Sequence, residues 1–174
     1  MPTFEHTISF RVRYSEIDKM GTFYNSHALE WFEWGRVELM RAVGLPYDQL
    51  EAQGFFLPLI EAHVEYQGRA SFDELLLMTT SMAISGKARV RFDMRIVSGG
   101  TGILPVCLTA VPSVVEPNGG QAPLPPMDKM SMPLGEKPLR KVAAGCTIHA
   151  ITDQAGRPRR PPSWLIEAIN KVNS

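Results

Sequence analysis

The sequence predicts an α+β fold in which an antiparallel sheet with one apolar face wraps around one long helix. Three observations support this expectation. Apolar and polar residues alternate in several segments, most cleanly from Ala88 to Ile96. A strongly apolar helical segment, from about Ser26 to Val43, follows the first of these segments. With 174 residues the chain can bury one substantial core, so we expect a single domain spanning residues 1–174.

The first predicted strand leads through a loop into the long helix. The apolar face of this strand carries Ile8, Phe10, Val12 and Tyr14, which alternate with polar residues. Residues 15–24 form the loop. Ser26 is a candidate N-cap for the helix, and Gly44 and Pro46 mark its end.

The predicted helix has a broad apolar arc and a charged arc when it is projected at 100° per residue. Arg36 lies in the middle of the apolar arc. A guanidinium in that position needs a partner, and we expect a carboxylate that is near it in space. The charged side also carries Trp31, Trp34 and Val37. Large exposed aromatic side chains there indicate a contact between subunits.

The rest of the chain predicts an antiparallel meander and a final helix. Four further strands are expected, at 60–67, 75–84, 88–96 and 143–151. Pro161 and Pro162 open the last helix, which runs from about Trp164 to Val172. Residues 99–138 hold most of the prolines and lack a clear period. We expect them to be an insertion within a hairpin loop, and we favour a mobile excursion over a functional lid.

The composition excludes several classes of function. Lys and Arg number 18, as do Asp and Glu, so no net field favours nucleic acid or an anionic membrane. The two cysteines, Cys107 and Cys146, argue against a disulfide framework and favour a reducing compartment. The N-terminus does not read as a signal peptide, and no apolar run reaches the length of about 20 residues that a transmembrane helix needs. We therefore expect a cytoplasmic protein without a membrane span.

The chemistry is expected in the loop before the long helix. Nucleotide-binding glycine motifs and a nucleophilic serine elbow are absent, and the histidines and cysteines lack the spacing of metal ligands. Glu16 and Asp18 are two residues apart, so an extended backbone would turn both to the same side. A carboxylate can act as a base or a nucleophile, and the free N–H groups of a helix start can polarise a carbonyl. The alternative is a solvated acidic turn.

Two linked motifs in this region resemble those of a known family. The pattern Tyr14-Ser-Glu-Ile-Asp18-x-x-Gly21-x-x-Tyr24, followed by Trp31-Phe-Glu33-x-x-Arg36, is similar to that of hotdog-fold acyl-CoA thioesterases. The nearest groups are the 4-hydroxybenzoyl-CoA thioesterase type and the Tol–Pal-associated type. The resemblance covers about three quarters of the chain, through 57–61, 64–66, 70–75 and 147–165. It implies a hotdog fold, homodimers or homotetramers, and active sites at the dimer interface.

The resemblance also implies roles for individual residues. Asp18 would attack the thioester carbonyl or activate water, the backbone N–H of Asn25 would polarise that carbonyl, and Tyr14 would assist. Gly21, Tyr24 and His27 are candidate substrate contacts. Exposed cations would hold the phosphates of coenzyme A, and the candidates are Lys87, Arg89, Arg157, Arg159 and Arg160. No metal and no cofactor beyond the coenzyme A of the substrate are implied.

The chain departs from the family pattern at two positions. Asn25 stands where the Tol–Pal-associated type has a histidine, and an asparagine cannot shuttle a proton near neutral pH. Ala28 replaces the usual aromatic residue, which leaves room for a wider acyl pocket. If Asp18 alone carries the chemistry, the resemblance is closer to the 4-hydroxybenzoyl-CoA type, in which the carboxylate and the helix dipole suffice. Two alternatives stay open: hydrolysis of acyl-carrier-protein thioesters, and a non-catalytic hotdog module that binds acyl groups.

Overall fold

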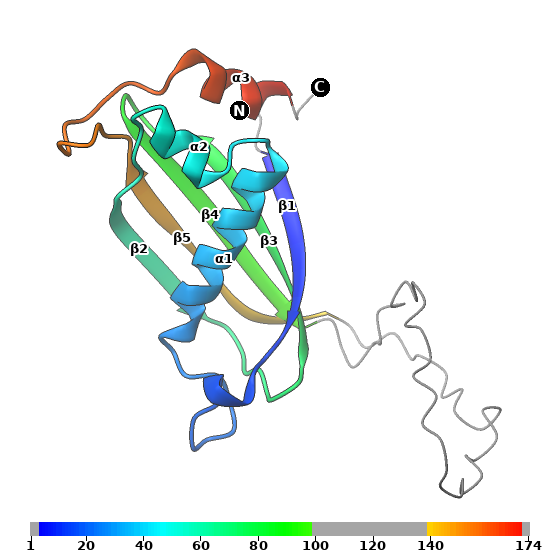
Figure 1. Ribbon diagram of the computed structural model, residues 1–174. Coiled ribbons are helices and arrows are strands. Elements are labelled where there is room, and N and C mark those ends of the chain that lie inside the picture. Colours follow the sequence, from blue (N-terminus) through cyan, green and yellow to red (C-terminus); the bar gives the residue numbers. More distant parts are fainter. Residues whose placement is uncertain (1–3, 99–138, 172–174) are drawn as a thin grey trace, which may run out of the picture.

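The fold is a single antiparallel sheet with a long helix lying on one face (Figure 1). The structure is a computed structural model that describes residues 4–98 and 139–171. The sheet has the strand order β1-β3-β4-β5-β2, and all neighbouring strands run antiparallel. The strands are β1 (Phe4–Arg11), β2 (Leu59–Tyr66), β3 (Leu75–Ile84), β4 (Arg89–Ser98) and β5 (Arg140–Ala150).

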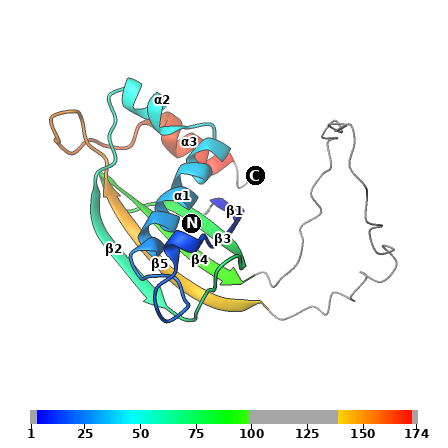
Figure 2. The ribbon, with the colours of Figure 1, turned by 60° about the horizontal axis from the view of Figure 1, so that its bottom comes forward.

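Helix α1 (His27–Ala42) crosses the face that the curved sheet turns toward it (Figure 2). A short 3-10 helix, η1 (Tyr14–Glu16), precedes it, and α2 (Tyr47–Ala52) and α3 (Ser163–Lys171) lie near its C-terminal end. The chain therefore enters α1 at one end of the sheet and leaves it at the other. The loop expected to carry the chemistry lies at the entry end.

The core lies between α1 and the sheet. Its largest fully buried side chains include Phe32, Leu39 and Met40 of α1, which face Leu76, Met78 and Met82 of β3 and Phe92, Met94 and Ile96 of β4. Side chains alternate in burial along β4, because successive residues of a strand point to opposite faces. The helix and the strands expected from periodicity are confirmed, with ends that differ by a few residues.

Two glycines allow close approach inside this core. A Cβ at Gly35 of α1 would lie 2.5 Å from Thr80 Oγ1 and 2.7 Å from Met78 Cε. A Cβ at Gly145 of β5 would lie 2.8 Å from Cε2 of Phe32 and would collide with the backbone carbonyl of His63. Distances this short exclude an ordinary side chain, so α1 packs directly on β3 and β5 at these points.

The N-terminal strand begins and ends earlier in the chain than the alternation predicts. β1 ends at Arg11, and Tyr14 lies in η1 with 80% of its surface exposed. The prediction that Tyr14 lies on the apolar face of a strand is therefore wrong. The backbone of Val12 is already bonded to the 73–74 turn, accepting from Asp73 N and donating to Glu74 O. The chain beyond Val12 then turns into η1.

The expectation for Trp31 is also wrong, because only 2% of its surface is exposed. Two rings cover this side of the helix: Phe10 of β1 and Phe23 of the loop before α1 pack on the Trp31 ring with centroids 5.2 and 4.8 Å away. Trp34 remains partly exposed beside Phe10. A helical projection contains no information about such a covering loop.

The proposed insertion, 99–138, lies outside the described residues. The described residues on either side of it are neighbours, because Ser98 of β4 pairs with Arg140 of β5. Among the helices of the described part, none is both long enough and apolar enough to cross a membrane.

Candidate active site

The loop that carries Asp18 is a tight turn closed by its own backbone. Ile17 and Phe23 form an antiparallel bridge, and Asp18 N–H donates to the carbonyl of Thr22 at 2.8 Å. Gly21 has φ of +71°, a conformation that glycine adopts at little cost. The chain therefore reverses between residues 17 and 23 and returns to the start of α1 (Figure 1).

The Asp18 carboxylate is held by this turn through one of its oxygens. Oδ1 accepts hydrogen bonds from Met20 N–H at 2.7 Å and Thr22 N–H at 3.4 Å. Within residues 4–98 and 139–171, Oδ2 has no hydrogen-bond donor, and the side chain is half-buried. A carboxylate oriented through one oxygen, with the other free, can attack an electrophile or take a proton from water.

Glu16 has a structural role and does not join Asp18 in the site. Its buried carboxylate accepts from Arg13 N–H at 2.7 Å and from Trp31 Nε1–H at 3.1 Å. Its carbonyl accepts from Tyr24 N–H at 2.8 Å. These bonds tie the loop to α1 at both ends. The expectation that both carboxylates face the same side is therefore wrong, because η1 rotates Glu16 inward.

The start of α1 leaves two consecutive N–H groups free. The N–H groups of His27, Ala28 and Leu29 donate to carbonyls three residues earlier, at 3.0, 3.3 and 3.1 Å. Those of Asn25 and Ser26 have no acceptor in the described part of the chain. Unbonded N–H groups at the positive end of a helix attract negative charge, which is the property an oxyanion site needs.

The other predicted residues around this loop have mixed environments. Tyr14 stacks edge-on against the Phe72 ring at 5.6 Å and is otherwise open to solvent. Tyr24 is exposed. His27, the first residue of α1, bonds through Nδ1 to Glu30 Oε2 at 2.8 Å and is engaged on the surface of the helix.

The candidate coenzyme A cations lie at the other end of the molecule. Lys87 is in the turn between β3 and β4, Arg89 is the first residue of β4, and Arg157, Arg159 and Arg160 are in the loop before α3. Figure 1 places both segments at the end of the sheet opposite the Asp18 loop. Within one chain, the structure does not bring these cations to Asp18. Arg159 is also stacked over the Phe55 ring at 4.5 Å.

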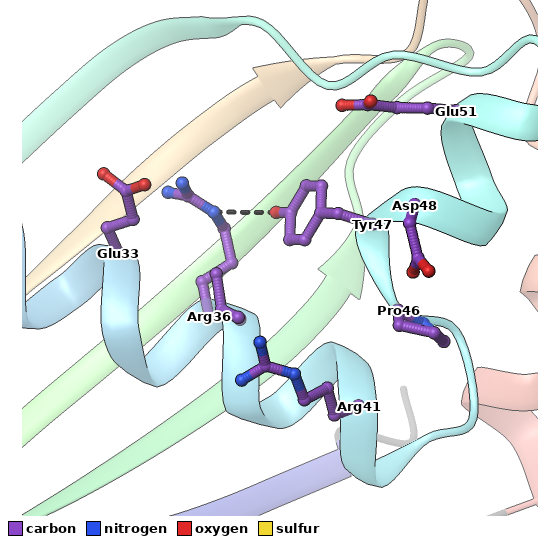
Figure 3. Close-up of a pocket in the computed structure, with 8 residues that line it drawn as sticks. Glu33, Arg36, Arg41, Pro46, Tyr47, Asp48 and Glu51 are labelled. Carbon is purple, nitrogen blue, oxygen red and sulfur yellow. Dashed lines mark hydrogen bonds between the residues drawn. The ribbon is translucent and has the colours of Figure 1, made fainter.

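A cavity of about 700 Å³ lies near the C-terminal half of α1 and contains none of the predicted site residues. Arg36 projects into it toward Tyr47 of α2 (Figure 3). Arg36 Nε donates to Tyr47 Oη at 2.7 Å and Nη1 to His149 Nε2 at 3.0 Å. In the part of the chain that the structure describes, no carboxylate lies within 4.0 Å of this guanidinium. The prediction that a carboxylate pairs with Arg36 is therefore wrong.

Two neutral groups therefore hold Arg36. His149 must donate from Nδ1 to the Leu57 carbonyl, at 2.8 Å, which leaves Nε2 as the acceptor for Arg36. Burial lowers the pKa of His149, and the nearby Arg36 charge lowers it further, against the opposing effects of the Leu57 bond and Glu33. Burial raises the pKa of Tyr47, although Arg36 opposes this shift.

The lowered pKa of His149 predicts a loss of stability in mild acid. In the unfolded chain this histidine takes up a proton near pH 6.5, whereas in the folded chain burial keeps it neutral to a lower pH. The contribution of the neutral His149 to the free energy of unfolding is therefore fully present above pH 6.5. It is expected to fall as the pH drops from 6.5 toward the lower folded pKa. Thermal unfolding between pH 8 and 5 measures this slope. His149→Gln should flatten it, whereas the matched surface variant His63→Gln should leave it unchanged; equal slopes in all three proteins would refute the assignment.

Tyr66 and Arg69 are two contacts of the loop that sequence reasoning missed. Tyr66 Oη donates to the Asn25 carbonyl at 2.8 Å, and Arg69 Nη2 donates to the carbonyl of Met20. Both come from the end of β2 or just beyond it, more than 40 residues away in sequence. No local spacing predicts such contacts, since they depend on β2 ending beside the start of α1.

Among the described residues, no group of three or more His, Cys, Asp or Glu side chains could hold a metal ion.

The family of the chain follows from a match over most of its length. A family model described as the thioesterase-like superfamily matches residues 12–169. The chain belongs to the thioesterase-like superfamily. The matched region includes the Asp18 loop, α1 and the strands from β2 onward, so the candidate site of this superfamily member lies within the matched residues.

Two curated relatives are similar over a shorter region. The Bacillus subtilis protein "Putative acyl-CoA thioesterase YneP" is 32% identical over 69 residues, which are 40% of this chain and 50% of that protein. An Aquifex aeolicus protein named "Putative esterase" is 31% identical over 65 residues, 37% of this chain and 51% of its own length. The chain thus spans about half the length of the curated relatives that it matches.

Solved structures show that this superfamily member has the hotdog fold. A 1,4-dihydroxy-2-naphthoyl-CoA thioesterase from Synechocystis superposes with a TM-score of 0.70 at 14% identity, covering 98% of this chain and 99% of that chain. A 4-hydroxybenzoyl-CoA thioesterase mutant in complex with 4-hydroxybenzoyl-CoA gives a TM-score of 0.68 at 13% identity, with 95% and 98% covered. A hypothetical protein from Thermus thermophilus gives 0.68 at 23% identity, with 98% and 99% covered.

Proposed function

We propose that this protein hydrolyses acyl-CoA thioesters with Asp18 as the reacting carboxylate. The observation that carries the proposal is the geometry of the loop, in which Asp18 is held through Oδ1 while Oδ2 has no donor among the residues that the structure describes. Membership of the thioesterase-like superfamily and the name of the Bacillus subtilis relative support the same chemistry.

The reaction needs a nucleophile or base and a site for negative charge. In one route, Asp18 Oδ2 attacks the thioester carbonyl, the C–S bond breaks to release the coenzyme A thiolate, and water then hydrolyses the acyl-aspartyl anhydride. In the other route, Asp18 takes a proton from a water molecule that attacks the same carbonyl, and the tetrahedral intermediate then breaks its C–S bond to release the coenzyme A thiolate and the carboxylic acid. In both, the carbonyl oxygen becomes negative, and the free N–H groups of Asn25 and Ser26 stabilise it. Tyr14, exposed beside the loop, would assist at the leaving group.

The same proposal includes a homodimer formed through β2. This strand is at the edge of the sheet, seven of its eight residues are exposed, and Leu59 and Ile60 are 54% and 49% exposed. An open edge with apolar side chains pairs readily with another strand. An antiparallel β2–β2 pairing around a twofold axis would continue the sheet across two copies.

Such a dimer would bring the candidate cations of one chain toward Asp18 of the other chain. In an antiparallel pair, one end of each protomer adjoins the opposite end of its partner. The loop that carries Arg157 follows β5, the neighbour of β2, so the partner's Arg157 would come toward the Asp18 end of the first protomer. The coenzyme A phosphates would then bind cations of one chain while Asp18 of the other reacts.

The proposal also places the protein in the cytoplasm, since two cysteines in 174 residues are typical of a reducing compartment.

The dimer predicts a measurable mass. Sedimentation equilibrium of the purified protein should give at least twice the chain mass of 19.4 kDa. The double variant Leu59→Lys and Ile60→Lys places charges on the exposed edge strand and should shift the protein toward monomer. Ile166→Lys, a similar exposed change on α3, is the control and should not. A monomeric wild-type protein would contradict the dimer.

A hydrolysis screen tests the activity and its alternatives. Free thiol is measured with a panel of aliphatic and aromatic acyl-CoAs, and with the same acyl groups on an acyl-carrier protein. We expect turnover of at least one acyl-CoA at a higher kcat/KM than the matching carrier thioester. Faster turnover of carrier thioesters would favour the acyl-carrier-protein activity. Tight acyl-CoA binding without thiol release would instead indicate a non-catalytic acyl-binding module.

A further inference from the structure

Tyr66 links the edge strand β2 to the start of α1. It is the last residue of β2, and its hydroxyl donates to the Asn25 carbonyl at 2.8 Å. Its side chain is half exposed, so the bond is not a consequence of deep burial. Among the described side chains, it is the one that bonds the backbone of residues 24–26.

The Tyr66 ring is held in place by a row of aromatic side chains. Its centroid lies 6.2 Å from that of Phe23, and Phe23 lies 4.8 Å from Trp31. Trp31 is fixed in turn by its bond to Glu16. Because the ring is packed against this row, the position of the hydroxyl is set by the same elements that hold the Asp18 loop.

The bond acts on one peptide unit. The C=O of Asn25 and the N–H of Ser26 belong to the same planar trans peptide and point in opposite directions. The carbonyl accepts from Tyr66 and, over a longer distance of 3.3 Å, from Ala28 N–H. Fixing the carbonyl therefore fixes the direction of the Ser26 N–H, which has no acceptor of its own among the described residues.

We propose that Tyr66 is a positioning residue, which holds the peptide between Asn25 and Ser26 so that the Ser26 N–H is aimed, beside that of Asn25, at the thioester carbonyl oxygen. This inference rests on the proposed thioester hydrolysis. The charge on that oxygen develops only in the transition state, so a donor held in advance lowers the barrier without strengthening substrate binding. Loss of the Tyr66 hydroxyl leaves the longer Ala28 bond as the one hydrogen bond to this carbonyl among the described residues.

Tyr66→Phe is the direct test, since phenylalanine keeps the ring that packs on Phe23. We expect kcat for acyl-CoA hydrolysis to fall by about tenfold, less than the hundredfold or more that follows the loss of a donor itself, with KM changed by less than twofold. The matched control is Tyr47→Phe, which removes a tyrosine hydroxyl bonded at 2.7 Å at the other end of α1 and should leave kcat unchanged. A purely structural role would not separate kcat from KM in this way.

Amide hydrogen exchange gives a readout that does not depend on activity. In the full-length protein, exchange at the Ala28 amide, which donates to the same Asn25 carbonyl at 3.3 Å, should be faster in Tyr66→Phe than in wild type, with no change at Leu39 in the buried part of α1. Faster exchange along the whole helix would indicate general destabilisation and overturn the positioning role.

The outcomes separate this inference from the proposed function. If Asp18→Asn abolishes hydrolysis while Tyr66→Phe keeps kcat within twofold of wild type, the positioning role is overturned and the hydrolase stands. A rise in KM at constant kcat would overturn it too. If the wild-type protein hydrolyses no thioester, the proposed function fails, and the role of Tyr66 in a reaction fails with it, whatever the exchange at the Ala28 amide.

Discussion

Asp18→Asn is expected to lower kcat/KM for acyl-CoA hydrolysis by about 10² to 10⁴, the range found when a general base or nucleophile is removed. The substitution is close to a pure test of the reactive group. An asparagine Oδ1 can accept the same bonds from Met20 and Thr22 N–H, so the turn should keep its shape. The oxygen without a partner, Oδ2, becomes an amide nitrogen that can neither attack the carbonyl nor accept a proton.

Binding and folding measurements complete this prediction. The variant should bind acyl-CoA and unfold at the same temperature as wild type within a few degrees. Asp93→Asn is the matched control, because Asp93 pairs with Arg91 on the sheet and takes no part in the loop. Full hydrolytic activity in a folded Asp18→Asn protein would show that another group performs the reaction.

Gly145→Ala is expected to produce the largest loss of stability. Gly145 lies on β5 opposite Val64 of β2, and an added Cβ would collide with the His63 carbonyl and lie 2.8 Å from Cε2 of Phe32. The obstacle on one side is paired backbone, which moves only if β2 separates from β5. We expect a loss of about 3 kcal/mol in the free energy of unfolding, and a decrease of about 10 °C in Tm.

Thermal and denaturant unfolding measure this effect. Ala144→Val enlarges the neighbouring residue, whose side chain points to the opposite face of the sheet, and should change stability by less than about 1 kcal/mol. Because β2 also carries Tyr66, Gly145→Ala should reduce hydrolysis along with stability. Equal stability of the two variants would show that α1 and β2 do not approach β5 as closely as the structure describes.

The main elements of the fold could be predicted from the sequence. β3 occupies the predicted residues Leu75–Ile84, and β4 and α1 differ from expectation by one or two residues at each end. These elements have long, regular patterns of apolar residues because each buries one face against the others. Asp18 could be named because the carboxylate, the turn glycine and the helix start follow one another along the chain.

The remaining errors arose where contacts join distant segments. Trp31 was expected to be exposed because the projection of an isolated helix ignores the loop that covers it. Arg36 was expected to have a carboxylate partner, but its acceptors are Tyr47 and His149, the second of which lies 113 residues away. Tyr66 reaches Asn25 because β2 ends beside α1. In each case the partner is set by topology, which residue spacing does not contain.

The most direct test of the account is multiple-turnover hydrolysis of an acyl-CoA by the wild-type protein. Catalytic amounts of the protein are mixed with one aromatic and one aliphatic acyl-CoA, and the free thiol and the carboxylic acid are measured together. The account predicts that both products appear in equal amounts over many turnovers for at least one substrate, and that Asp18→Asn releases neither above background. Acyl-CoA that binds and remains intact, or equal rates for the two proteins, would contradict it.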